Sequence, residues 1–224
     1  MDQLLQNLKI KGNEKTFLKD PESTDLGRRI IEHSIQLINE IGFESFTFKK
    51  LALQINSTES SVYRYFENKH KLLLYLSSWY WSWLEYQLVF ATYSLQDPEE
   101  RLNKAIEIVT RTTEEDSTYS HINEVVLNKI VINEFSKSFL TKEVDFENKE
   151  GYFQIYKRLV NRIEKMVTEV NNDYKFSKSL ASTILESALH QHFLREHFPT
   201  ITACDKPETT TLFLTELVEK ALKN

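Results

Sequence analysis

Apolar residues recur at helical spacing along most of the chain, and polar capping residues separate the apolar runs. Ser23 or Thr24 can cap the first long helix, and Gly42 supplies its C-terminal break. Its buried stripe is predicted to be Ile30, Ile31, Ser34, Leu37, Ile38 and Ile41. Further helices are predicted at about 69–93, 98–115, 119–139, 150–171, 176–197 and 207–222, with an exposed, charged gap near 141–150. With only four Gly and four Pro, the chain should be almost entirely helical.

Two short helices follow the first long one. Thr47 can cap a helix whose apolar positions are Phe48, Leu51, Ala52 and Ile55. Asn56-Ser57 tolerates turn geometry, and Thr58 can cap a second helix at about 59–66. Val62 and Phe66 then face inward, while Tyr63 and Arg64 face outward. A short helix delivered by a tight turn is suited to insertion into the major groove of DNA.

These residues resemble the tetracycline-repressor (TetR) family of bacterial regulators. The matching positions are Thr47, Leu51-Ala52, Tyr63-Arg64-Tyr65-Phe66 and Lys69, and the resemblance covers about residues 25 to 75. Asn56-Ser57-Thr58 replaces the family's usual Gly-Val-Ser, Glu59 stands where Lys or Arg is frequent, and Ser60-Ser61 replaces Gly-Thr. These departures leave the operator sequence open, because Glu59 beside DNA either accepts from a cytosine amino group or repels phosphate.

The resemblance implies an all-α fold with an N-terminal three-helix DNA-binding domain containing a helix-turn-helix and a C-terminal helical domain. We predict an N-terminal arm at 1–22, the DNA-binding domain at 23–70, and an effector-binding and dimerisation domain at 71–224. The DNA-binding residues are predicted to be Arg28, Thr47, Thr58, Glu59, Ser60, Ser61, Tyr63, Arg64 and Lys69. Among these, Thr47, Tyr63, Arg64 and Lys69 are expected to contact phosphates, and Ser60 and Ser61 base edges or phosphates. Tyr65 fits either packing or DNA contact.

The net charge of −5 is unevenly distributed. Residues 23–75 contain seven basic and six acidic side chains, and residues 1–22 contain four of each, so the acidic excess lies in residues 76–224. A weakly basic domain on an acidic body is compatible with DNA binding but predicts weak non-specific affinity. The lysines of residues 1–22 either touch DNA or belong to a tail packed on the first helix.

The helix after Lys69 is unusually aromatic. Trp79, Trp83, Tyr86 and Phe90 share one helix face, which indicates either ordinary core packing or the wall of an effector pocket. His121, Glu124 and Tyr156 are candidates for polar groups in such a pocket. Glu186 and His190, four residues apart, have a spacing that can bind a metal, but without a cysteine or a second close His pair nearby they fit structural pairing or a solvated face better, so no metal site and no cofactor is predicted.

The last two predicted helices carry broad apolar faces. These faces include Leu185, Leu189 and Phe193 on one helix and Leu214, Leu217 and Val218 on the other. They either pack within one chain or, as the resemblance implies, form a four-helix bundle with a second copy. A two-fold dimer would match an inverted-repeat operator.

The sequence contains no phosphate-binding glycine loop and no nucleophile motif, so we expect no enzymatic activity. The single Cys204, the lack of an apolar run of ~20 residues and the lack of a signal peptide favour a cytoplasmic protein. We therefore predict a ligand-released homodimeric repressor that binds double-stranded DNA. The alternative is a helical ligand- or protein-binding module whose helix-turn-helix no longer binds DNA. The operator, the effector, the sign of regulation and the regulated genes stay open.

Overall fold

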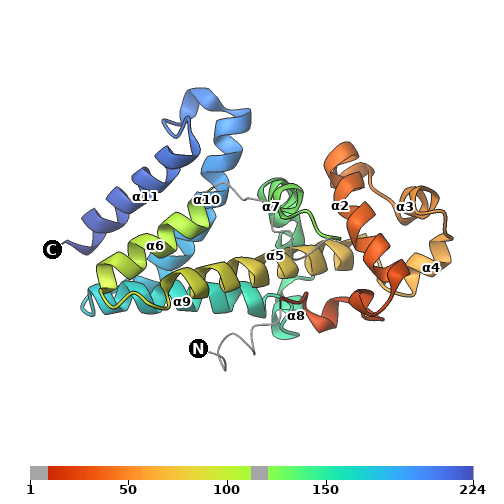
Figure 1. The fold of residues 1–224 in the computed structure, drawn as a ribbon, viewed down its shortest axis with the longest axis horizontal. Helices are drawn as coiled ribbons and strands as arrows, with labels where there is room; N and C mark the ends of the chain where they lie inside the picture. The colour runs from red at the N-terminus through yellow and green to blue at the C-terminus, as the bar shows by residue number, and fades with distance from the viewer. Residues whose placement is uncertain (1–9, 112–120, 224) are drawn as a thin grey trace. The chain divides into compact units, whose positions relative to one another are not determined.

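The computed structural model describes residues 10–111 and 121–223, and in these ranges the chain forms helices and no strand (Figure 1). The predicted all-α fold is therefore confirmed. The contacts divide the described residues into two compact units. One, here called the head unit, contains residues 10–82 and 121–155, and the other, the body unit, contains residues 83–111 and 156–223. Helix α5 (Lys69–Thr92) contributes residues to both units.

The head unit is built around α2 (Asp25–Ser45), which packs against α3 (Phe48–Gln54), α7 (Glu124–Phe139) and the 3-10 turn η2 (Pro21–Ser23). Helix α3 packs in turn against α4 (Glu59–Tyr63). The side chains between these helices are fully or almost fully buried and include Ile30, Ile35, Phe46, Leu51, Ile55, Val62 and Phe66. This apolar core fixes α4 relative to the helix before it.

Local capping chemistry sets the helix boundaries. Thr24, Thr47 and Thr58 each accept a hydrogen bond from the backbone N–H of the residue three positions later, as their sequence positions predict. Gly42 lies near the end of α2 with φ 74° and ψ 155°, a conformation restricted almost entirely to glycine. Asn56 adopts a left-handed φ of 50° in the turn between α3 and α4. Each of these features was expected from the sequence.

Residues 10–23 pack within the head unit. The backbone N–H of Asn13 donates to Ser78 Oγ at 2.7 Å, and its side-chain amide donates to the Gly151 carbonyl at 2.8 Å. The Phe17 ring lies edge-on to Tyr75, centroid to centroid at 5.9 Å. The described part of the predicted arm is therefore packed, but these contacts are to α5 and to Gly151 instead of the first long helix, and contact of the arm with DNA stays a prediction. Residues 1–9 lie outside the described residues.

Most residues in the predicted gap near 141–150 are exposed, as expected, but residues Val144–Lys149 form the short helix α8, so the expectation of a gap between helices is wrong. Its Glu147 is buried, and the carboxylate pairs with His70 Nε2 at 2.9 Å and Lys71 Nζ at 3.3 Å. These partners precede Glu147 by more than seventy residues, so local sequence gives no sign of the burial.

The body unit contains the C-terminal part of α5, α6 (Pro98–Thr110), most of α9 (Gln154–Val170), α10 (Ser177–His197) and α11 (Pro207–Leu222). Helices α6, α10 and α11 pack against one another (Figure 1). Glu85 of α5 is completely buried and accepts hydrogen bonds from Arg158 and Arg162 of α9, with Arg158 Nε at 2.8 Å from both oxygens. A buried carboxylate with two guanidinium partners ties α5 to α9.

A buried histidine ties α10 to α6. His192 Nε2 lies 2.8 Å from the Thr110 carbonyl, and its Nδ1 lies 2.7 Å from a terminal nitrogen of Arg195. The carbonyl can only accept and the guanidinium can only donate, so His192 is the neutral tautomer protonated on Nε2. Burial is the main cause that lowers the pKa of His192 from its ordinary value, which agrees with the neutral form.

Candidate functional site

The outer face of the α3–α4 pair presents polar side chains above a buried apolar layer. Val62 and Phe66 are completely buried, whereas Tyr63 is 47% exposed and Arg64 is exposed. The Tyr63 ring packs edge-on against Phe48 at 5.0 Å, which positions its hydroxyl outward from a rigid support. Helix α4 ends at Tyr63, somewhat before the predicted end at Phe66. The division into inward and outward residues is as predicted.

Three hydroxyl groups cluster at the start of α4. Thr58 Oγ1 lies 2.9 Å from both Ser60 Oγ and Ser61 Oγ, and it also accepts from the Ser61 backbone N–H. Thr58 and Ser60 are exposed. Since a hydroxyl can donate and accept at once, this cluster can meet base edges or phosphate oxygens. Glu59 is half-buried in the first turn of α4, where a carboxylate stabilises the helix.

Lys69 makes contacts that the sequence analysis did not foresee. Its ammonium donates to the carbonyls of Phe43 and Glu44, both at 3.0 Å, and to that of Phe46 at 3.4 Å. An ammonium has three donors, so these carbonyls occupy all of them in this conformation. The structure thus gives Lys69 a role in holding the end of α2, and its direct contact to phosphate stays a prediction.

Other predicted DNA contacts have mixed surroundings. Arg28 donates through one terminal nitrogen to the Glu22 carbonyl at 2.9 Å and keeps further donors for a ligand. Thr47 is exposed and accepts from the Lys50 backbone N–H at 3.2 Å. Tyr65, left open by the sequence, is buried with its hydroxyl 2.7 Å from Thr24 Oγ1, which indicates a packing role.

Residues 30–76 match the family model described as "Bacterial regulatory proteins, tetR family". The matched segment contains α3, α4 and the turn between them, where the polar outer face lies. This helix-turn-helix domain belongs to the TetR family. The chain is accordingly a DNA-binding transcriptional regulator.

Solved structures of TetR-type regulators share the fold. One is the crystal structure of AibR in complex with isovaleryl coenzyme A and operator DNA, which is 18% identical in sequence. The match covers 85% of this chain and 97% of the AibR chain, with a TM-score of 0.57. A transcriptional regulator from Rhodococcus sp. RHA1 is 14% identical, with coverages of 91% and 96% and a TM-score of 0.60. The fatty acid degradation regulator FadR from Bacillus halodurans is 14% identical, with coverages of 85% and 92% and a TM-score of 0.55. No curated protein matches the chain.

The aromatic residues proposed from the sequence to line a pocket differ in burial. Trp79 and Trp83 are 1% and 4% exposed, whereas Phe90 is 61% exposed and stacks on Tyr86 at a centroid distance of 6.3 Å. Two of the three polar candidates, His121 and Tyr156, pair with a residue of their own unit. His121 pairs with Glu22 at 2.9 Å, Glu124 is buried, and Tyr156 donates to Glu186 at 2.5 Å. Burial and Glu186 together raise the pKa of Tyr156 well above its ordinary value, so it stays a donor.

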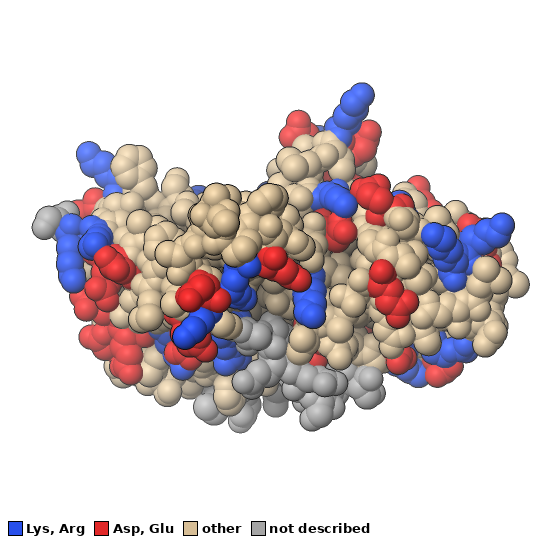
Figure 2. All heavy atoms as spheres, turned by 90° about the horizontal axis from the view of Figure 1, so that it is seen from above, with Lys and Arg blue, Asp and Glu red and all other residues tan. Residues whose placement is uncertain are grey.

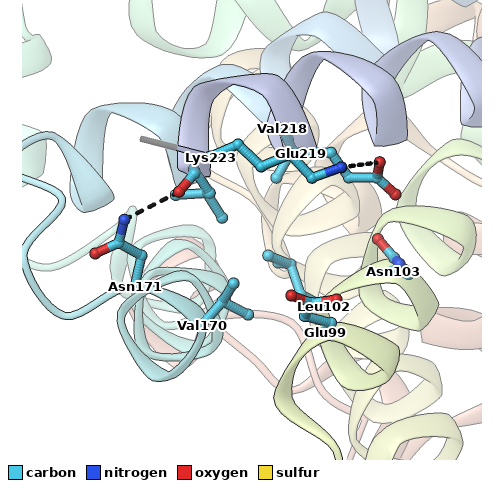
Figure 3. Close-up of a pocket in the computed structure, with 9 residues that line it drawn as sticks. Glu99, Leu102, Asn103, Val170, Asn171, Val218, Glu219 and Lys223 are labelled. Carbon is cyan, nitrogen blue, oxygen red and sulfur yellow. Dashed lines mark hydrogen bonds and ion pairs between the residues drawn. The ribbon is translucent and has the colours of Figure 1, made fainter.

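Two cavities in the body unit have linings that differ from this predicted set. The first, of about 270 Å³, lies between α6, α11 and the end of α9 (Figure 3). Its side chains combine Leu102, Val170 and Val218 with the charged Glu99, Glu219 and Lys223. The second, of about 320 Å³, is lined by Leu88, Val89, Thr92, Tyr93, Leu95, Gln96, Arg101, Arg162, Lys165, Met166 and Glu169. The predicted pocket residues therefore remain a prediction.

The residues predicted for dimerisation fall into two groups. Leu185, Leu214 and Val218 are almost completely buried within the body unit, so they already pack inside one chain. Leu189 and Phe193 are half-buried, and Leu217 is 40% exposed. Leu212 and Phe213 of α11, absent from the predicted set, are 68% and 44% exposed. Their exposure follows from the orientation of α11, which the apolar pattern alone leaves ambiguous.

Charge on the surface is mixed. Acidic and basic side chains are interspersed on the face shown in Figure 2, with no continuous patch of either sign there. None of the described helices is both long enough and apolar enough to cross a membrane.

Proposed function

We propose that the protein is a homodimeric repressor that a small molecule releases from an inverted-repeat operator. The observation that carries the proposal is the polar outer face of α4, held by the buried Val62 and Phe66. Ser60 and Ser61 contact base edges or nearby phosphates, and Tyr63, Arg64, Thr47 and Arg28 contact phosphates. Residues 23–70 supply these contacts, while effector binding and dimerisation belong to residues 71–224. The protein acts in the cytoplasm and has no catalytic activity.

The dimer is proposed to form through α10 and α11. Leu212, Phe213 and Leu217 leave apolar surface exposed on α11, and Phe193 adds to it from α10. A second copy related by a two-fold axis would bury this surface and place two α4 helices on successive half-sites. Two copies are also needed because one domain with a nearly balanced charge binds DNA weakly.

Release by an effector follows from half-site geometry. A dimer reads half-sites separated by about one helical turn, ~34 Å, so a change in the spacing of the two α4 helices prevents both from docking. An effector drives this change only if it binds one arrangement more tightly than the other. The AibR structure contains both isovaleryl coenzyme A and operator DNA, which supports an effector-responsive regulator here.

Selection of random double-stranded DNA at near-physiological salt tests the proposal. The full chain should retain a set of sequences that share an inverted repeat. Arg64→Gln should retain much less DNA, whereas the same change at the exposed Arg111 of the body unit should retain as much as the parent. Recovery of no enriched sequence, from protein shown to be folded, would contradict the proposal.

The alternative is a protein whose helix-turn-helix no longer binds DNA. Glu59 at the start of α4 and the mixed surface charge favour it. A salt titration with random duplex DNA separates the two possibilities, because a DNA-binding protein loses affinity steeply as salt rises. A flat and weak response would favour the alternative.

A further inference from the structure

The cavity of about 320 Å³ in the body unit combines an apolar floor with a basic rim. Leu88 and Val89 of α5 and Met166 of α9 supply the apolar part. The charged lining comprises Arg101, Arg162 and Lys165 against the single carboxylate of Glu169. The volume lies near the lower end of the range of about 300–1,000 Å³ that is usual for ligand sites, so the occupant is small.

The three basic residues are not equally available. Arg101 is occupied, since it donates to Glu169 at 2.6 Å and to the Leu95 carbonyl at 2.9 Å. Arg162 donates to the buried Glu85 through Nε, which leaves its two terminal amino groups for another acceptor. Lys165 is exposed and has no ion-pair partner among the residues that the structure describes. Arg162 and Lys165 stand three positions apart on α9, so their side chains share a face.

We propose that this cavity binds a small amphiphile with one carboxylate and a short aliphatic chain. The carboxylate lies between the Lys165 ammonium and the terminal amino groups of Arg162, where two cations face one incoming anion. The aliphatic chain covers Leu88, Val89 and Met166. This inference rests on the proposed function and deepens it by naming the chemical class of the effector.

The cavity of about 270 Å³ in the body unit supplies a comparison within the same protein. Its lining carries Glu99 and Glu219 against Lys223, and Lys223 already pairs with Glu219 at 3.5 Å (Figure 3). An anionic ligand is therefore disfavoured there and favoured in the cavity at Lys165. The same change of a lysine to glutamine is therefore expected to weaken binding of an anion at Lys165 and to leave it unchanged at Lys223.

Titration calorimetry of the full chain without DNA tests the proposal, with octanoate, octanol and octylamine as probes. Octanoate should bind at least about threefold more tightly than octanol, since an exposed ion pair contributes modestly. Octylamine should bind most weakly. Lys165→Gln should weaken octanoate about three- to fivefold and leave octanol unchanged, and the matched control Lys223→Gln should leave both unchanged.

Equal binding of octanoate and octanol would overturn the proposal, as would a loss of octanoate binding in Lys223→Gln but not in Lys165→Gln. The absence of octanoate binding would overturn it as well. Because no DNA is present, these outcomes are independent of the operator selection. Failure here with a recovered inverted repeat would leave the regulator proposal standing and remove only the effector class.

Discussion

Replacing Lys69 by methionine measures how much its ammonium contributes to the stability of the head unit. Methionine keeps most of the aliphatic stem but removes the charge and the donors to the carbonyls of Phe43, Glu44 and Phe46. A hydrogen bond to a charged group contributes about 1.5–3 kcal/mol net. The three bonds share one half-buried ammonium, so we expect one such contribution for the set. The ammonium also lies 4.8 Å from the centre of the Phe43 ring, which adds about 0.5 kcal/mol.

We therefore expect Lys69→Met to lower the free energy of unfolding by about 2–3.5 kcal/mol, measured by urea denaturation of the full chain. Lys49→Met on the exposed side of α3 is the matched control and should change stability by less than about 0.5 kcal/mol. The reasoning would be refuted if Lys69→Met were as stable as the parent while its DNA affinity and salt dependence fell. That result would return Lys69 to the direct phosphate contact expected from the sequence.

Three further changes probe other contacts. Replacing both cationic partners of Glu85, with Arg158→Met and Arg162→Met, should lower the free energy of unfolding by about 3–5 kcal/mol in urea denaturation. Adding Glu85→Met to this double variant should restore most of that loss. Equal stability of the double and triple variants would contradict a buried charge interaction. Gly42→Ala should lower the free energy of unfolding by about 1–3 kcal/mol, because a backbone with φ 74° and ψ 155° is strained in any residue with a Cβ. An unchanged stability would show that the backbone at this position relaxes easily. The pKa of His192 is lowered in the folded protein, so on acidification the imidazole is protonated first in the unfolded chain, and the free energy of unfolding should fall as pH drops below about 6.5. His192→Gln should flatten that decline. An unaltered pH profile of stability would refute the assignment of His192 as a buried neutral imidazole.

Local signals in the sequence were sufficient for the helix-turn-helix. Thr24, Thr47 and Thr58 cap helices through bonds to residues three positions away, so a short window of sequence contains both partners. Val62 and Phe66 are four positions apart, about one helical turn, so the same short window of sequence also shows that they are buried together. The outward direction of Tyr63 and Arg64 then follows from helix geometry alone.

Contacts between distant parts of the sequence were beyond such reasoning. Lys69 meets carbonyls more than twenty residues earlier, and carbonyl groups are present at every position, so composition gives no hint of which ones are used. Glu147 looks like one of several acidic residues in a charged stretch until His70 and Lys71 are brought to it. The cavity linings likewise depend on which faces of α5 and α9 meet, which periodicity does not specify.

The side chain of Asn13 has a consequence for protein engineering. Its amide donates to the carbonyls of Gly151 and Tyr152, while its backbone N–H donates to Ser78, so a residue near the start of the chain bridges two segments far along it. Glu134 and Lys137 of α7 also reach Phe43 and Glu44 at the end of α2. A chimaera that transplants residues 10–70 as a cassette would sever all of these bonds. Exchange of DNA specificity between relatives is therefore better attempted by substituting the outward residues of α4 within an otherwise intact chain.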